Sequence, residues 1–290
     1  MQGPLLFPGG IRAMPPKDLF VRIFERSLSW KIILSRLGGD PRTRLGLLLS
    51  SFIDTIWFAV RPSARALPQT CFAGVIRVRV HGRAYQFFVR RLTDDAYFCV
   101  PGREKDVHDQ ILGLLRSGDV YVDVGSNVGY YAVLASAIVG ATGRVIAIEP
   151  SPETAKVLEQ NIQLNGAGNV TVVNAAAWKE SGQVRITWPK GVHGFASAVR
   201  TNRSVSALVR ADSLNRICAE IPRIRLIKID VEGAELEVLK GADAILARTD
   251  YLIVELSENI VEVRELLHTA SFQLRDMAFK PHVLGMRQDG

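Results

Sequence analysis

A short apolar strand, a glycine-containing turn and an apolar helix follow one another in this chain, and together they most constrain its fold. Residues 121–124 are β-branched or aromatic apart from Asp123, which is typical of a buried parallel strand. Gly125 and Gly129 allow the backbone to turn tightly before a mostly apolar helix over residues 128–139. Because ligands in open α/β sheets bind at the carboxyl ends of the strands, the turn is predicted to border a ligand site.

A second apolar strand is predicted over residues 145–148, and it ends at the acid Glu149. In nucleotide-binding α/β folds an acid at this place accepts hydrogen bonds from ribose hydroxyls. An ordinary strand–turn–helix capped by Ser126 or Asn127 would explain the first unit alone, but not the acid one unit later. The two features together predict a site for a nucleoside cofactor, with Glu149 at its ribose.

The spacing of the glycines indicates which cofactor binds. Dinucleotide folds use Gly-x-Gly-x-x-Gly, which lets backbone amides approach a pyrophosphate. This chain instead has Gly125-x-x-x-Gly129, with the carboxylate of Asp123 just before it. A fixed negative charge opposes a pyrophosphate but suits a ligand with an ammonium and a sulfonium group. S-adenosylmethionine is such a ligand, and the spacing opposes a nicotinamide-dependent oxidoreductase.

The net charge of +7 is concentrated at the amino-terminal end. Residues 1–70 carry ten Lys or Arg and four Asp or Glu, whereas residues 71–290 carry 26 basic and 25 acidic residues. A polyanionic substrate would require a basic surface on the catalytic part. No nucleic-acid partner is therefore expected, and a nucleic-acid-modifying enzyme is a weaker alternative.

Residues 1–70 are predicted to form a basic, apolar, helical extension, and residues 71–290 the main domain. Apolar side chains recur at helical spacing over residues 18–37, with basic residues between them. Residues 45–60 are strongly apolar too, but a membrane-spanning helix needs about 20 residues. Asp54 interrupts the run, and an Asp at the centre of a span costs about 2.5 to 3.5 kcal/mol. The sequence favours a packed or surface-lying helix over a membrane span.

The partner of this extension is left open by the sequence. Packing on the main domain or on a second copy, as a homo-oligomer, is favoured; contact of residues 17–60 with the inner surface of a membrane is the alternative. Cys71, Cys99 and Cys218 are scattered, so neither a zinc site nor a disulfide framework is expected, and a reducing compartment fits best. No signal peptide is convincing. The expected location is the cytoplasm, with the inner membrane surface as the alternative.

The rest of the chain follows an alternating pattern. The runs 75–80 and 85–89 predict a β-hairpin with Gly82 at its turn. Strand and helix patterns then alternate, which predicts an α/β fold with a doubly wound, mostly parallel sheet. A Gly- and Ser-rich loop, residues 191–202, interrupts the alternation, and His193 in this loop is a candidate for contact with an acceptor.

A second group of acids follows the predicted buried strand 226–229. Asp230 and Glu232 stand at the exit of this strand, and Glu235 begins the next helix. A helix N-terminus favours negative charge by about 0.3 to 1 kcal/mol, which explains Glu235. It explains Asp230 less well, because an acid directly after an apolar strand lies at the ligand edge of the sheet.

Three segments resemble the FkbM family of S-adenosylmethionine-dependent methyltransferases: Asp123-Val-Gly-Ser-Asn-Val-Gly129, Ile148-Glu-Pro150 and Ile227-Lys-Ile-Asp-Val-Glu-Gly-Ala-Glu235. The resemblance covers about residues 75–256 and implies a class I methyltransferase fold, which is Rossmann-like. Family members typically move a methyl group to a hydroxyl, often on a sugar or a polyketide-derived product. By motif, the family's functional positions fall on Asp123, Gly125, Asn127, Gly129, Glu149, Asp230, Glu232 and Gly233.

The resemblance implies an O-methyltransferase acting on a hydroxyl of a sugar, glycolipid or small-molecule acceptor; an N-methyltransferase on the same fold is the alternative. Asp230 is the first candidate for a general base and Glu232 the second. Asp230, Glu232 and Glu255 are also candidate ligands for Mg²⁺, which prefers oxygen donors, and a structural role is open as well. Asn174 is expected at the adenine. The predicted cofactor contacts are Asp123, Gly125, Ser126, Asn127, Gly129, Glu149, Pro150, Asn174 and Ala175.

Overall fold

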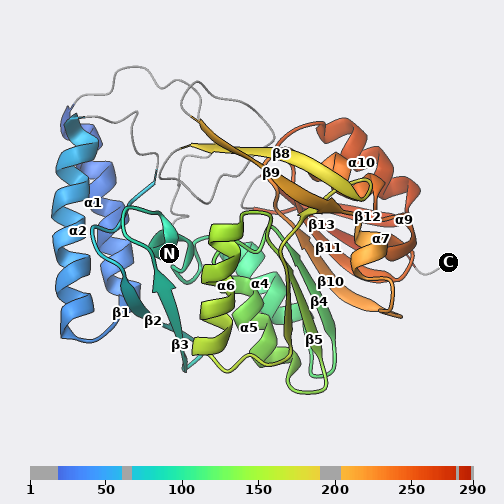
Figure 1. Ribbon diagram of the computed structural model, residues 1–290, viewed down its shortest axis with the longest axis horizontal. Coiled ribbons are helices and arrows are strands. Elements are labelled where there is room, and N and C mark those ends of the chain that lie inside the picture. Colours follow the sequence, from blue (N-terminus) through green and yellow to red (C-terminus); the bar gives the residue numbers. More distant parts are fainter. Residues whose placement is uncertain (1–18, 61–66, 190–203, 279–280, 289–290) are drawn as a thin grey trace.

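A seven-stranded sheet forms the centre of the protein (Figure 1). The computed structural model describes residues 19–60, 67–189, 204–278 and 281–288. The strand order is β12-β13-β11-β10-β4-β5-β6, and the pairings are parallel except for those of β13 with β11 and β12. The strands are β4 (Val120–Val124), β5 (Arg144–Ile148), β6 (Val170–Val173), β10 (Ile224–Ile229), β11 (Thr249–Glu255), β12 (Phe272–Asp276) and β13 (His282–Arg287).

Helices cover both faces of this sheet, as predicted (Figure 1). Successive residues of a strand point to opposite faces. Tyr121 and Val145 therefore pack with α4 (Lys105–Leu114), α5 (Tyr130–Val139) and α6 (Pro152–Leu164), and Val122 and Ile146 pack on the other face. That face is covered by α7 (Leu214–Ile217), α8 (Glu235–Lys240), α9 (Asp243–Leu246) and α10 (Ile260–Thr269).

The last two strands were not anticipated from the sequence. β12 and β13 form an antiparallel pair, and β13 also pairs antiparallel with β11, which brings His282 opposite Glu255. β12 has two large apolar residues, Phe272 and Leu274, and a Gly interrupts β13 at position 285. Such short runs give no clear strand pattern. The pairing places a histidine at the edge of the sheet where the predicted acids stand.

The predicted hairpin is confirmed. It consists of β2 (Gly74–Val80) and β3 (Arg83–Val89), and β1 (Leu37–Gly38) adds a third strand. His81 and Gly82 both have positive φ, 47° and 81°, as a two-residue type I′ turn requires. The short helix α3 (Asp95–Phe98) follows.

The alternating runs on either side of residues 191–202 pair with each other. β8 (Gly182–Pro189) and β9 (Ser204–Asp212) are antiparallel, and β7 (Ala176–Ala177) joins β9 in a separate small sheet. In Figure 1 this sheet crosses the upper part of the molecule, in yellow and orange. The candidate His193 lies outside the described residues.

The amino-terminal extension contains the two expected helices, α1 (Leu19–Arg36) and α2 (Pro41–Val60), side by side at the left of Figure 1. The extension is joined to the main domain by β1, which pairs with β2, and by Trp30 and Leu47, which lie in the same core as Tyr121. Among the described residues, α2 alone is long and apolar enough to cross a membrane by length and composition, and 28% of its apolar window is buried. The apolar helix is thus longer than the predicted run 45–60.

Candidate cofactor and acceptor site

Two glycines shape the turn after β4. Gly125 has φ 81°, and a Cβ added there would lie 1.9 Å from the carbonyl oxygen of Asp230. Gly129 has φ 87°, and a Cβ there would lie 2.4 Å from a side-chain carbon of Leu158. Any larger residue would clash at both places, and positive φ is strained for most residues with a side chain. The glycines therefore let the turn approach the exit of β10 and the helix α6.

Glu149 connects the turn after β4 with the start of α6. Its carboxylate accepts hydrogen bonds from the backbone N–H of Asn127, at 3.0 Å, and of Ser151, at 2.9 Å. Burial raises the pKa of Glu149 to about 7, although these two backbone donors favour its ionised form. Each oxygen accepts one of the two bonds, so each keeps a lone pair for a hydroxyl donor.

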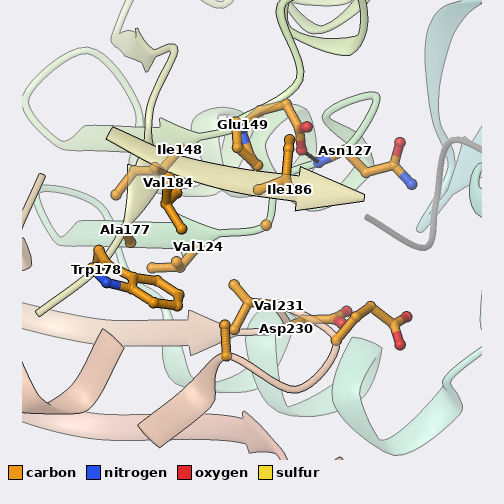
Figure 2. A pocket seen from close by; sticks show the side chains of 15 residues that line it. Val124, Asn127, Ile148, Glu149, Ala177, Trp178, Val184, Ile186, Asp230 and Val231 are labelled. Atoms are coloured by element: carbon orange, nitrogen blue, oxygen red, sulfur yellow. Dashed lines mark hydrogen bonds between the residues drawn. The ribbon is translucent and has the colours of Figure 1, made fainter. Parts of the chain in front are cut away.

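A cavity of about 670 Å³, its open mouth included, lies at the carboxyl ends of β4, β5 and β10. Glu149 and Asn127 lie on one side of the cavity and Asp230 on the other (Figure 2). The walls between them are mostly apolar and are formed by Val124, Ile148, Ala176, Ala177, Trp178, Val184, Ile186 and Val231.

Six of the predicted site residues line this cavity: Gly125, Asn127, Glu149, Pro150, Asp230 and Glu232. Gly129 shapes the turn, and the Ser126 hydroxyl donates to the backbone carbonyl of Asp123 at 2.7 Å. The Asp123 carboxyl is buried, and Asp123 is not among the residues that line the cavity, although its neighbour Val124 is. One oxygen of the Asp123 carboxyl accepts from the Tyr121 hydroxyl at 3.3 Å, and the other has no partner among the described residues.

Asn174, which is expected at an adenine, bonds to the backbone and lies outside the cavity lining. Its side-chain amide donates to the backbone carbonyls of Glu149, at 2.8 Å, and Pro150, at 3.2 Å. Asn174 is exposed, and neither it nor Ala175 lines the cavity. An Asn at a strand end readily bonds to nearby backbone groups, and here that local bonding holds the side chain. The next residues along the chain, Ala176 to Trp178, form the apolar wall instead.

The acids after β10 meet a buried lysine. The Lys228 ammonium lies 2.7 Å from an Asp230 carboxylate oxygen, and the Lys228 side chain is 3% exposed. Carboxylate oxygens of Asp230, Glu232 and Glu255 lie within 4.8 Å of one another. Glu232 also has φ 51°, a backbone conformation that is uncommon for a residue with a side chain.

The three acids of this cluster have different proton affinities. Burial by itself would raise the pKa of Asp230, but the charge of Lys228 brings that pKa well below its usual value. Burial and the negative charge of Asp230 raise the pKa of Glu232 to about 8 and that of Glu255 further. The negative charge of the cluster is therefore held preferentially at Asp230, and Glu232 and Glu255 bind protons more tightly than ordinary carboxyl groups do.

Two further polar residues, Glu104 and His282, lie close to Asp230 and were missed by sequence reasoning. A carboxylate oxygen of Glu104, one of Asp230 and a ring nitrogen of His282 all lie within 4.8 Å of one another. Glu104 is buried, forms an ion pair with Arg103 at 2.6 Å and accepts a hydrogen bond from the Tyr131 hydroxyl at 3.1 Å. Glu104 comes from the turn before α4 and His282 from β13, so no local pattern connects either of them with Asp230.

Comparison with known proteins identifies the family. A family model described as "Methyltransferase FkbM domain" matches residues 123–280, more than half of the chain. The chain belongs to the FkbM methyltransferase family. This FkbM protein is therefore an S-adenosylmethionine-dependent methyltransferase, and its strand order agrees with a class I, Rossmann-like fold. The family excludes the nicotinamide-dependent alternative.

Several relatives are similar to this FkbM methyltransferase. The hexuronic acid methyltransferase AglP of Haloferax volcanii is 28% identical over 242 residues, which cover 80% of this chain and 95% of the relative. Methyltransferase 1 of Beauveria bassiana is 24% identical over 144 residues, which cover 42% of this chain and 57% of the relative. A solved S-adenosylmethionine-dependent O-methyltransferase from Thermotoga maritima has a TM-score of 0.41 at 16% identity, covering 74% of this chain and 78% of that one.

Proposed function

We propose that this FkbM methyltransferase transfers the methyl group of S-adenosylmethionine to a hydroxyl oxygen of a sugar-containing acceptor. The observation that carries the proposal is the Lys228–Asp230 pair, which places one ionised carboxylate in the cavity that Glu149 also lines. The similarity to a hexuronic acid methyltransferase over 80% of the chain supports a sugar.

The residues of the cavity fit the cofactor. Glu149 has a free lone pair on each oxygen for the ribose hydroxyls, and the apolar wall from Ala176 to Trp178 is suited to an adenine ring. The turn at Gly125 and the unpartnered oxygen of Asp123 are suited to the amino-acid part, whose ammonium is a hydrogen-bond donor. When bound, S-adenosylmethionine supplies an electrophilic methyl group on a positively charged sulfur.

Asp230 is proposed to accept the hydrogen bond of the acceptor hydroxyl and so to orient its oxygen. Holding two reactants in line can contribute about 7 to 11 kcal/mol to the rate. Because Lys228 lowers the pKa of Asp230, this carboxylate stays ionised but is a weak base. Glu232 and Glu255, with raised pKa values, hold a proton more tightly than Asp230 does, so the hydroxyl proton passes to whichever of these two carboxyl groups is ionised.

The charge of the cluster favours a hydroxyl over a carboxylate as the methyl acceptor. A sugar carboxylate in contact with Asp230 would bring two negative charges together in a partly buried site, which costs free energy. A neutral hydroxyl can donate to Asp230 instead. Within a sugar acid we therefore expect a methyl ether, with the carboxylate held away from Asp230.

The proposal is tested by incubating the protein with methyl-labelled S-adenosylmethionine and either uronic acid glycosides or neutral sugar glycosides. We expect label in a product that resists mild alkali, as an ether does. A product that releases its label in mild alkali would be an ester and would contradict the hydroxyl acceptor. Label in neither sugar set, but in amine-containing acceptors, would favour N-methylation.

A further inference from the structure

The helix α2 carries a continuous apolar stripe on its exposed side. Its apolar residues are spaced three or four apart over the whole helix, which places them on one face. Their exposed fractions range from 44% to 73%. The first helix adds Phe20, Phe24 and Leu28, which are 79%, 69% and 40% exposed. The stripe of α2 consists of Leu45, Leu48, Leu49, Phe52, Ile53, Ile56, Trp57 and Val60.

The opposite side of α2 is partly polar and faces the protein. The Ser50 hydroxyl accepts from the backbone N–H of Cys71 at 2.8 Å, and the Thr43 hydroxyl donates to the carbonyl of Val75 at 3.3 Å. Asp54 is 1% exposed and accepts a hydrogen bond from the Trp30 ring nitrogen at 2.9 Å. In a helix that meets water, polar residues are expected outside and apolar ones inside. Here much of that distribution is reversed.

The charges near this stripe indicate what covers it. Lys31, Arg42 and Arg44 are exposed, and Asp40 is the one exposed acid within the described residues 19–60. A second copy of the chain would bring a second group of like charges to the same surface. An anionic lipid surface instead attracts basic residues and accepts apolar side chains between its headgroups.

We propose that the outer face of the α1–α2 hairpin docks on an anionic lipid bilayer, with both helices in the plane of the surface. An in-plane position agrees with the contacts of α2 to residues 69–75. The hydroxyls of Ser50 and Thr43 bond to Cys71 and Val75, and Asp54 accepts from the backbone N–H of Gln69 at 3.3 Å. A spanning α2 would lose these bonds, whereas docking by the outer stripe keeps them. In Figure 1 the hairpin forms one edge of the molecule, away from α7, α9 and α10.

The test is co-sedimentation of the full-length protein with vesicles of phosphatidylcholine, with and without phosphatidylglycerol. We expect binding to the anionic vesicles at low salt, and weaker binding as salt screens the charges. The double variant Phe52→Asp/Ile56→Asp should bind at least about tenfold more weakly, because it places two negative charges on the face that would enter the lipid surface. The matched control is Val261→Asp on α10, another exposed apolar residue, 65% exposed, which should bind as the parent does.

Two further variants separate the charge from the apolar stripe. Arg42→Gln/Arg44→Gln should lower affinity for anionic vesicles by about fivefold for each charge removed. Trp57 should be quenched by lipids with brominated acyl chains, and Trp57→Phe should lose that quenching. Cofactor binding and thermal melting, measured for every variant, establish that the fold is kept.

The proposal is overturned if the full-length protein does not bind anionic vesicles at low salt, or if the Phe52→Asp/Ile56→Asp variant binds them as well as the parent. A dimer in solution that this double variant dissociates, with no vesicle binding, would assign the stripe to a second copy of the chain. A folded variant that loses vesicle binding but keeps cofactor binding supports the proposal. These outcomes do not depend on the methyl acceptor.

Discussion

Two buried ion pairs stand in different parts of this methyltransferase, and they differ in how fully their charges are satisfied. In the α1–α2 hairpin, Arg26 lies 3.5 Å from Asp54, and the Arg26 guanidinium also lies 3.9 Å from the ring centroid of Phe58. Asp54 accepts further bonds from Trp30 and Gln69. Here one acid is surrounded by donors, which is the arrangement of a structural pair.

The pair Lys228–Asp230 is crowded by further acids instead. Glu232 and Glu255 approach Asp230. Burial and the negative charge of Asp230 raise the pKa of both, so ionisation of either one beside Asp230 is unfavourable. The site also opens into a cavity, which the Arg26–Asp54 pair does not line. A buried pair with surplus acids beside a cavity is typical of a functional site, whereas a fully satisfied pair is typical of a packing contact. The comparison predicts opposite effects of removing each acid.

The largest effect on stability is expected for Asp54→Ala. This change leaves Arg26 buried without its carboxylate, which costs about 3 to 5 kcal/mol of unfolding free energy. Chemical denaturation of the variant measures that loss. Asp109→Ala is the control, because Asp109 and Lys105 form an exposed pair worth at most about 1 kcal/mol. A variant at Asp54 as stable as the parent would contradict the structural role of the pair.

Asp230→Asn should affect turnover more than the fold. The amide keeps the shape of the side chain but removes its negative charge, so kcat should fall by about 10²-fold or more. Cofactor affinity, measured by calorimetry, and melting temperature should change little, because Glu232 or Glu255 can ionise near Lys228 in place of Asp230. If Asp230→Asn stays fully active, or unfolds as Asp54→Ala is expected to do, the contrast between the two pairs fails.

Glu149→Ala should weaken binding of S-adenosylmethionine by about 1.5 to 3 kcal/mol, because it removes a charged hydrogen-bond acceptor from the cavity. Calorimetry with the cofactor measures this loss. The structure offers Asn174→Ala as a matched control. Asn174 follows β6, the strand next to β5, but it is exposed and outside the cavity lining, so the affinity of this variant for S-adenosylmethionine should stay unchanged. The reverse result would return Asn174 to the cofactor site and remove Glu149 from it.

The sequence predicted those parts of the site that depend on neighbouring residues. A strand, a glycine turn and a helix follow from local pattern, so the places of Gly125 and Glu149 at the cavity were predictable. Glu104 and His282 reach Asp230 only through the packing of α4 and the antiparallel pairing of β13. Neither contact leaves a periodic signal. Asn174 lies outside the cavity lining, and its side chain bonds locally to the backbone.

The same reasoning applies to the amino-terminal helices. The apolar spacing of α1 and α2 was evident, but periodicity does not show which face is covered. Asp54 was interpreted as an interruption of an apolar run, and the structure shows it turned inward toward Arg26 and Trp30. The outward stripe became visible only when the partners of the other face were known.

The raised pKa of Glu149 predicts how stability depends on pH. The folded protein holds the Glu149 proton up to a pKa of about 7, whereas the unfolded chain releases it near its ordinary value of 4.5. Between these values the folded state binds more protons, so stability should fall as pH rises through this window. Melting temperature against pH, without cofactor, measures the slope. Glu149→Gln should flatten it between about pH 4.5 and 7, and an unchanged slope would show that other groups cause the trend.

The smallest effect is expected from metal chelation. Among the residues that the structure describes, both groups of side chains that could hold a metal ion share Asp230, and the Lys228 ammonium already lies 2.7 Å from that carboxylate. The positive charge of Lys228 therefore opposes a second cation at the same carboxylate. Treatment with a chelator should therefore leave methyl transfer unchanged. Loss of activity that Mg²⁺ restores would instead make Asp230, Glu232 and Glu255 metal ligands. The extra carboxyl groups around Asp230, which the Arg26–Asp54 pair lacks, would then be explained by a bound metal ion rather than by proton binding.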